Sequence, residues 1–242
     1  MRRTLLVALA ALMALAVAAT PALAVKSDQS LSAAVKSVQK NGMATATKKK
    51  PANVEITLNP KIAYDKTDNP FSTSRAVIFL DRAISFGGGA LPGCTAPKVL
   101  LGKCSANTKV GSGYAKALAA GLDENLTATA YNGSDGRTLL VRVQASKPVP
   151  IDEVIIGTLS KSTSKGYASK LTLDIPKGLQ QPAPGAYATL LDFNIKVKGG
   201  SAKTPLLSVN TCPTGGLKLG GTFYFTDNTT QKASTTARCA GR

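Results

Sequence analysis

The chain has 242 residues, and its 30 lysines and arginines against 13 aspartates and glutamates give a formal net charge of +17. It contains no histidine and no tryptophan. Without imidazole, a Ser-His-Asp triad and a Cys-His pair are excluded, and most zinc-water sites lose their usual ligand. The positive charge instead favours anionic partners.

Residues 1–24 have the three parts of a secretory signal peptide: a basic start, an apolar run and an end of small residues. We expect cleavage between Ala24 and Val25. The apolar run, residues 4–19, is shorter than the roughly 20 residues that a membrane-spanning helix needs, and no second run follows. Cleavage would leave 218 residues with a charge of +15, because two arginines are removed. We expect this mature chain to be secreted, with no transmembrane segment.

Residues 25–52 differ in composition from the rest of the chain. They are rich in Lys, Ser, Ala, Gln and Thr and contain no aromatic residue, which predicts a mobile, basic N-terminal arm. Leu31 and Val35 also fall at helical spacing, so a short amphipathic helix is an alternative, although isolated helices of this length are marginal in water. The arm ends in three lysines that we expect to contact a polyanion: Lys48, Lys49 and Lys50.

From about residue 54 onward, apolar and polar residues alternate in short runs, a pattern typical of half-buried antiparallel strands. In the clearest run, Phe193, Ile195 and Val197 alternate with polar neighbours. The alanine-rich residues 115–120 fit a helix or a strand. The strand candidates are residues 54–58, 76–80, 109–119, 126–131, 141–143, 154–159, 171–175, 192–198, 206–211 and 222–226.

Glycine- and proline-rich turns separate these runs at fairly even spacing. The pattern predicts an all-β domain over residues 53–242, an antiparallel β-sandwich or jelly-roll-like fold of about ten strands. One domain is favoured because no long linker divides the chain. Two small sandwiches that meet near residues 148–150 are the alternative.

The four cysteines of an exported chain indicate disulfides. We expect the local pairs Cys94–Cys104 and Cys212–Cys239, because each pair is close in sequence and brackets turn residues. Loop-closure entropy gives stabilisations of roughly 3 and roughly 3.5 kcal/mol. A metal site fits poorly, because the chain has no Cys-x-x-Cys and no histidine.

Residues for catalysis are scarce. Asp123-Glu124 and Asp152-Glu153 are adjacent acids, and Ser160-Lys161 is an adjacent Ser-Lys pair, but neighbours on a strand point to opposite faces. We therefore expect no catalytic residue, no cofactor and no metal. Specific nucleic acid binding is not expected either, since aromatic residues are few.

Several motifs occur in a recognisable order: Leu91-Pro92-Gly93-Cys94, Cys104-Ser105, Lys109-Val110-Gly111-Ser112-Gly113, Tyr131-Asn132-Gly133, Leu173-Asp174-Ile175-Pro176-Lys177-Gly178-Leu179, Cys212-Pro213 and Cys239. In this order the chain resembles a group of exported actinobacterial (high-GC Gram-positive) proteins whose function is not established. The resemblance covers most of residues 54–242. It implies a secreted all-β domain and supports the local disulfide pairing, but it carries no activity.

The charge and the predicted export together favour a secreted, non-catalytic binding or structural protein of the cell envelope. Its partner would be an anionic cell-wall polymer or another extracellular polyanion, held electrostatically. Two alternatives stay open. One is a secreted hydrolase with a carboxylate or Ser-Lys site, and the other is a carrier of small molecules or lipids in the sandwich interior.

Overall fold

The computed structural model describes residues 28–39, 42–43, 45–63, 71–119, 121–201 and 203–240. The expected signal peptide and its cleavage point between Ala24 and Val25 lie outside these residues. Over the described part of the chain the fold is all-β, with fourteen strands and two short α-helices.

The strands, in chain order, are β1 (Asp28–Ser37), β2 (Ala52–Ala63), β3 (Thr73–Asp81), β4 (Ile84–Phe86), β5 (Lys109–Ala119), β6 (Leu122–Asn132), β7 (Thr138–Ala145), β8 (Ile151–Lys161), β9 (Tyr167–Asp174), β10 (Ala188–Val197), β11 (Leu207–Val209), β12 (Leu217–Phe225), β13 (Thr230–Ala237) and β14 (Cys239–Ala240). The helices are α1 (Ala96–Leu100) and α2 (Lys177–Gln180), with 3-10 turns at Gly88–Ala90 and Ala106–Thr108.

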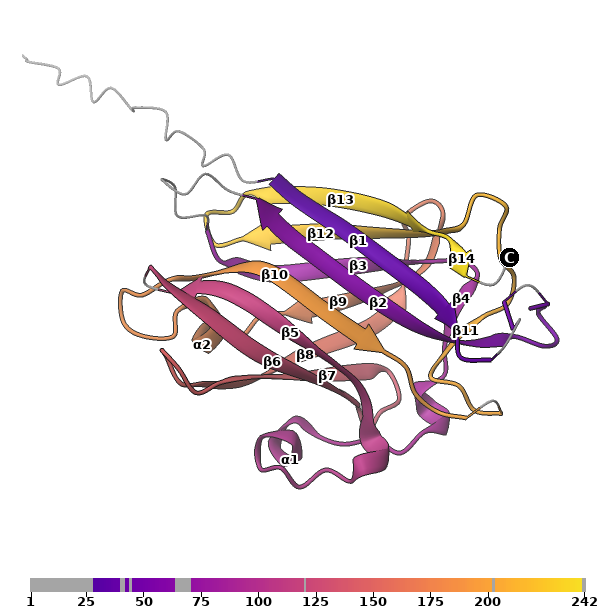
Figure 1. The fold of residues 1–242 in the computed structure, drawn as a ribbon, viewed down its shortest axis with the longest axis horizontal. Helices are drawn as coiled ribbons and strands as arrows, with labels where there is room; N and C mark the ends of the chain where they lie inside the picture. Colours follow the sequence, from indigo (N-terminus) through magenta and orange to yellow (C-terminus); the bar gives the residue numbers. More distant parts are fainter. Residues whose placement is uncertain are drawn as a thin grey trace, which may run out of the picture.

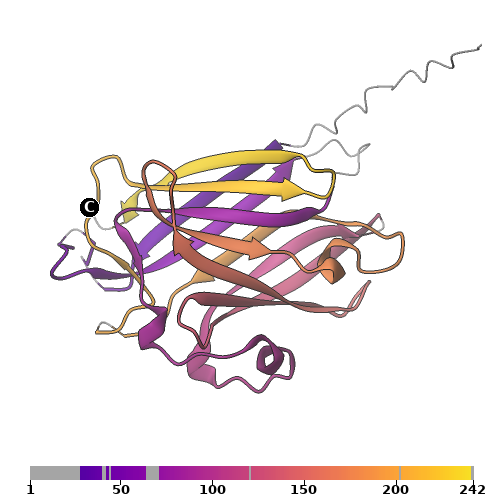
Figure 2. The same ribbon diagram turned by 180° about the vertical axis from the view of Figure 1, so that it is seen from behind.

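Twelve of the described strands form one hydrogen-bonded order, β13-β12-β3-β9-β8-β7-β6-β5-β10-β2-β1-β14, and β11, which also pairs with β4, branches from β2. The sheet curls into two facing layers (Figures 1 and 2). The front layer of Figure 1 contains β1, β2, β10, β5 and β6, and the back layer contains β13, β12, β3, β9, β8 and β7. All pairings are antiparallel except β1 with β14, so the predicted antiparallel two-layer fold is confirmed, with more strands than the ten expected.

The core fills the space between the two layers. Alternate residues of each strand point inward, as Val54 and Ile56 of β2 do in the front layer and Ile78 and Leu80 of β3 in the back layer. Phe223 of β12 adds an aromatic ring to the same cluster. A fully buried side chain of this kind contributes about 1.5–3 kcal/mol, so these alternating positions supply most of the drive to close the layers.

The expectation of a mobile arm over residues 25–52 is wrong for Asp28–Ser37, which forms β1. This strand pairs with β2 along its whole length and buries Leu31 and Val35, which are 6% and 1% exposed. A spacing of four residues keeps two side chains on one face of a strand as well as of a helix. The spacing therefore identifies the apolar positions correctly, and it is the pairing with β2 that makes this segment a strand and not a helix.

The alanine-rich end of β5 is a strand, which settles the ambiguity that the sequence left at residues 115–120 for all but the last of them. Its inward positions are all small, and a Cβ on Gly113 would collide with the backbone of Asn194 and Ile195 on β10. Glycine thus permits close pairing of β5 with β10. The same run of small side chains leaves room in the interior, which becomes important below.

Candidate functional site

The outward side of the front layer is rich in lysine. The strands β1, β2, β10 and β5, with the residue that follows β10, carry six exposed lysines: Lys36, Lys61, Lys109, Lys116, Lys196 and Lys198. We call this surface the lysine face. The same strands carry three outward acids, Asp28, Glu55 and Asp192, so the lysine face has an excess of positive charge.

The acids of the lysine face are shared among its lysines. Glu55 lies 3.6 Å from Lys196 Nζ and 4.0 Å from Lys198 Nζ, and Asp192 lies 3.3 Å from Lys61 Nζ. Each of these lysines is more than half exposed, so the pairs contribute little to stability. Within the described part of the chain, the other three lysines of the face form no ion pair.

A hollow of about 440 Å³ lies on the lysine face where β1 ends and β2 begins. Its rim includes three of the lysines and the exposed Ser112. Lys109, Lys196 and Lys198 therefore reach one depression from two neighbouring strands, β5 and β10. Ammonium groups gathered in this way attract anionic groups of a partner.

Lys48, Lys49 and Lys50 lie on an exposed turn that leads into β2. The turn is closed by Thr47, whose backbone N–H and carbonyl bond the carbonyl and N–H of Lys50 at 3.1 Å each. Its hydroxyl also accepts from Lys50 N–H at 3.1 Å. The three lysines predicted to contact a polyanion are thus presented to solvent on a defined turn, and their contact with a polyanion stays a prediction.

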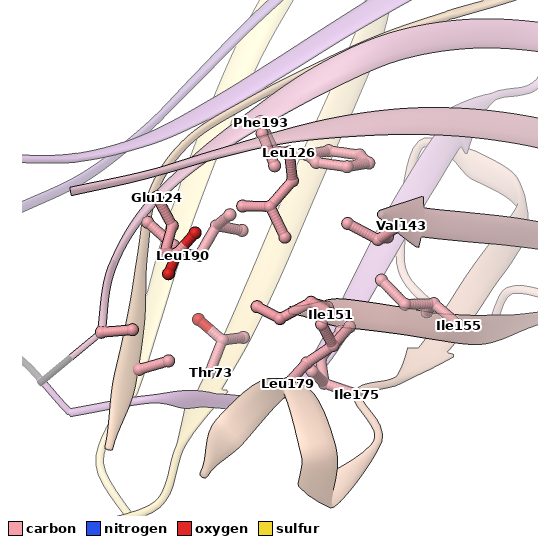
Figure 3. Close-up of a pocket in the computed structure, with 14 residues that line it drawn as sticks. Thr73, Glu124, Leu126, Val143, Ile151, Ile155, Ile175, Leu179, Leu190 and Phe193 are labelled. Carbon is pink, nitrogen blue, oxygen red and sulfur yellow. The ribbon is translucent and has the colours of Figure 1, made fainter. Parts of the chain in front are cut away.

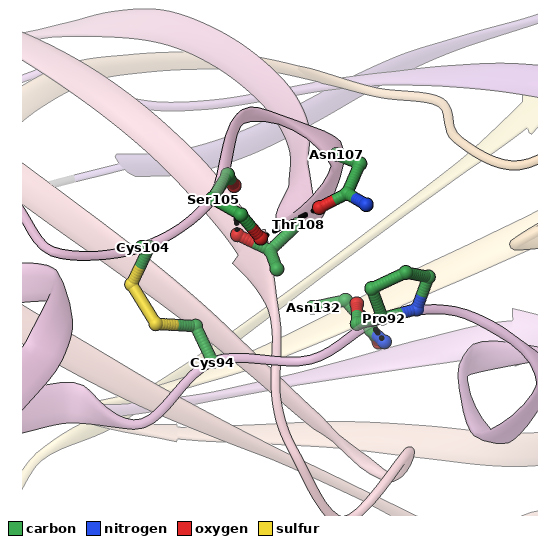
Figure 4. The surroundings of a disulfide bond; sticks show 7 residues. All are labelled: Pro92, Cys94, Cys104, Ser105, Asn107, Thr108 and Asn132. Carbon is green, nitrogen blue, oxygen red and sulfur yellow. Dashed lines mark hydrogen bonds between the residues drawn. A yellow bond between two sulfur atoms is a disulfide. The ribbon is translucent and has the colours of Figure 1, made fainter.

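Both predicted disulfides are confirmed: Cys94 bonds Cys104, and Cys212 bonds Cys239. Figure 4 shows the first of them, which closes the loop that carries α1. The backbone of Cys94 also bonds Asn132 at the end of β6, with the N–H of Cys94 donating to the Asn132 carbonyl at 2.8 Å. The stapled loop is therefore fixed to the sheet as well as to itself.

Asn132 holds this end of the sheet from inside. Its side chain is fully buried, and its Nδ2 group donates to the carbonyl oxygens of Gly88, Leu91 and Pro92 at 2.9, 3.3 and 3.1 Å. Figure 4 shows the amide reaching toward Pro92. These bonds satisfy three backbone acceptors of a segment without a strand partner, so Asn132 has a structural role.

The adjacent acids and the Ser-Lys pair lie on strands. Asp123 of β6 is exposed whereas Glu124 is buried, because the two side chains point to opposite faces. Asp152 of β8 points outward to Arg142, with bonds of 2.7 and 2.6 Å, and the hydrogen bond from Arg142 lowers the pKa of Asp152 below its ordinary value of 3.8. Ser160-Lys161 ends β8 as consecutive exposed residues.

Glu124 lines an interior cavity of about 70 Å³, which we call the Glu124 cavity. Its walls come from both layers: Ala115 and Leu126 in the front, and Ile151 in the back. Leu179 of α2 covers one end. In Figure 3 the carboxyl group of Glu124 points into the space, and its neighbours are almost all hydrocarbon.

A second interior cavity, of about 90 Å³, extends the first. We call it the Phe223 cavity, after its largest aromatic wall in the back layer. The two cavities share five lining residues, so they lie next to each other between the layers: Thr73, Ile155, Ile175, Leu190 and Phe193.

From the sequence alone Glu124 is half of an adjacent acidic pair, and neither cavity could be located, although a carrier that uses the interior was left open. The available signal was the series of small inward residues on β5, which cannot fill the space that longer side chains would occupy. Which side chains face β5 across the interior depends on how the sheet curls. That arrangement is a property of the whole fold and is not encoded in the β5 segment.

Among the described residues, no helix has the length and apolar character to cross a membrane, and no three His, Cys, Asp or Glu side chains gather as metal ligands. Comparison with known protein families, with curated proteins and with solved structures finds no match. The resemblance to exported actinobacterial proteins therefore stays a prediction. The lysine face and the interior cavities are the features of the described residues that bear on function.

Proposed function

We propose that the chain is an exported, non-catalytic binding protein of the cell envelope whose lysine face binds an anionic surface polymer. The observation that supports this proposal best is the excess of lysine over acid on the outward side of β1, β2, β10 and β5. Lys48, Lys49 and Lys50, on the turn before β2, extend the positive surface beyond the sheet.

The arrangement suits a polymer better than a single small anion. The lysines follow four neighbouring strands, which stand about 4.8 Å apart in any sheet, so the positive charges are spread over a broad surface. All six are exposed, and Lys61, Lys196 and Lys198 keep more than half of the side chain in water. Binding through such groups is electrostatic and long-ranged, and salt screens it within about 10 Å at 0.1 M ionic strength.

The test is retention of the mature chain, residues 25–242, on purified cell wall across a salt series, with and without the anionic polymer of that wall. Retention should require the polymer and fall steeply as salt rises. Retention that is unchanged at about 0.5 M salt, where screening is strong, would contradict an electrostatic hold. No retention at low salt would contradict the proposal as a whole.

Matched variants locate the surface. Replacing Lys109, Lys196 and Lys198 by glutamine removes three charges from the hollow of the lysine face. The control removes the same number of charges elsewhere, at Lys165, Lys170 and Lys218 on or beside the back layer. The first triple variant should lose at least about tenfold in retention, because several attractive contacts are lost together, and the control should lose much less. Equal losses would mean that net charge alone, and not this surface, binds the polymer.

Of the two alternatives, the hydrolase gains no specific observation from the arrangement of the acids and the Ser-Lys pair. The carrier of small molecules does, because the interior holds cavities lined by hydrocarbon. That observation is independent of the lysine face and leads to a separate inference.

A further inference from the structure

The Glu124 carboxyl group is buried with one of its two oxygens lacking a hydrogen-bond partner among the described residues. The side chain is 1% exposed, and Oε1 accepts the backbone N–H of Val149 at 2.8 Å. Oε2 has no partner within the described part of the chain. A buried carboxyl oxygen without a partner costs free energy, so its retention at this position calls for a reason.

The surroundings of Glu124 offer no compensating charge. Among the described residues that line the Glu124 cavity, none is basic, and the one other polar side chain is Thr73. In Figure 3 the carboxyl group of Glu124 and the hydroxyl of Thr73 point toward the same part of the cavity. The polar end of the space is thus small and carries an acceptor, while the rest is hydrocarbon.

The space is large enough for a small ligand. A cavity of about 150 Å³ lined by apolar side chains accommodates benzene, which has six heavy atoms. The Glu124 and Phe223 cavities, of about 70 and 90 Å³, adjoin through shared lining residues such as Phe193. Their joint length runs from the carboxyl group of Glu124 toward the rings of Phe193 and Phe223.

We propose that this interior space binds a small amine: a hydrocarbon body of about six carbons, sized by the cavity, with one terminal ammonium group. The ammonium group would donate to Glu124 Oε2 and supply the opposite charge that a buried carboxylate requires. The hydrocarbon body would lie against Leu126, Ile155 and Phe193. An ammonium fits better than a hydroxyl, because a neutral ligand leaves the carboxylate without a counter-charge. The site is distinct from the lysine face, which repels cations.

Calorimetric titration of the mature chain with hexylamine, 1-hexanol and benzene at neutral pH tests the proposal. Hexylamine should bind at least about tenfold more tightly than hexanol, as expected for a hydrogen bond to a charged partner. In Glu124→Gln this preference should disappear, while Val149 N–H keeps an acceptor. The matched control is Asp123→Asn, which removes the same charge from the exposed neighbour on β6 and should keep the preference.

A second variant removes the space and leaves Glu124 in place. In Ala117→Leu the added side chain enters the Glu124 cavity, so hexylamine should lose its tighter binding relative to hexanol. Should Glu124→Gln fail to fold, Ala117→Leu still decides the matter. Undetectable binding of hexylamine to the wild type, equal affinity for hexylamine and hexanol, or unchanged hexylamine binding in either variant would each overturn the proposal. The last result would mean that the amine binds an exposed carboxylate.

Discussion

The two ends of β6 bury polar side chains on the same inward face, and they use them differently. Asn132 is 0% exposed and Glu124 is 1% exposed, and three buried apolar residues, Leu126, Ala128 and Ala130, separate them on that face. At the C-terminal end of β6, the amide of Asn132 donates to three backbone carbonyls. At the other end, Glu124 accepts one backbone N–H and turns its second oxygen into a cavity.

The comparison shows that burial alone does not indicate the role of a polar side chain. One oxygen of each group lacks a described partner, but Asn132 Oδ1 lies against the backbone of Gly88, where an added Cβ would be only 2.7 Å away. Glu124 instead faces a cavity whose described lining residues come from both layers. The Asn132 end of β6 therefore holds a loop against the sheet, whereas the Glu124 end faces the interior cavity.

The largest expected effect tests the structural role of Asn132. Asn132→Asp keeps the shape of the side chain but replaces the donor with an oxygen that faces three carbonyl oxygens. We expect a loss of about 3 kcal/mol or more in the free energy of unfolding, because three acceptors lose their donor and a charge is buried without a partner. Urea unfolding monitored by circular dichroism measures it. Asn125→Asp, the same change on the exposed face of β6, is the control and should stay near wild type.

The second prediction concerns the two disulfides, of which Cys94–Cys104 closes the loop beside Asn132. Replacing both Cys94 and Cys104 by serine should cost roughly 3 kcal/mol, and replacing both Cys212 and Cys239 roughly 3.5 kcal/mol, because the loops that they close differ in length. Equilibrium unfolding of the two double variants measures both values. A loss below about 1 kcal/mol for the first pair would mean that the hydrogen bonds of Asn132 already order the loop without the disulfide.

The third prediction tests the role of Glu124 in its cavity. Glu124→Gln should leave the free energy of unfolding within about 1 kcal/mol of wild type, since it keeps the size of the side chain and an acceptor for Val149. The same unfolding experiment applies, with Asp123→Asn as the control. A loss as large as that of Asn132→Asp would erase the difference between the two ends of β6 and assign Glu124 a structural role.

The smallest expected effect lies outside the interior, at the paired side chains of β7 and β8. Arg142→Met should raise the pKa of Asp152 toward 3.8, because the hydrogen bond from Arg142 is the main cause of its lowering. Since the folded pKa is lowered, the pair stabilises the fold above pH 3.8, and this contribution is lost as the pH falls through the folded pKa. The stability difference between variant and wild type should therefore shrink in acid. Carboxyl NMR titration follows the pKa, and an unchanged value would show that the pair is open in solution.

Much of the fold could be predicted from local patterns. Every strand candidate with clear alternation overlaps a strand, although residues 171–175, 192–198 and 222–226 each extend one residue past the end, and both disulfides join cysteines that are close in sequence. The patterns failed where the apolar signal was weak. In β13 the inward residues include Gln231 and Thr235, so no hydrophobic period marks this strand. In β1 a spacing of four residues suited two structures at once.

The candidate sites could be predicted only in part. The lysines of the front layer are visible in the sequence, but their gathering on one face depends on the pairing of β10 with both β2 and β5. The cavity depends on a still larger assembly, because its walls come from strands on opposite layers. Glu124 has the same local pattern as a solvated acid beside a turn. The one local sign of the cavity beside Glu124 is the run of small inward residues on β5, which leaves space unfilled.

The first and last strands of the sheet, β13 at one edge and β1 with β14 at the other, contact each other, and this affects the kinetics of folding. The strands β5 to β9 follow one another as neighbours, so this ribbon can assemble from local contacts. By contrast, β1 pairs with β14, where Val35 lies opposite Cys239, and β1 also packs against β13. Such distant pairings form slowly. Closure of the two layers is therefore a late step, and until β13 and β14 have docked, β1 is an unprotected edge at which chains are most prone to aggregate.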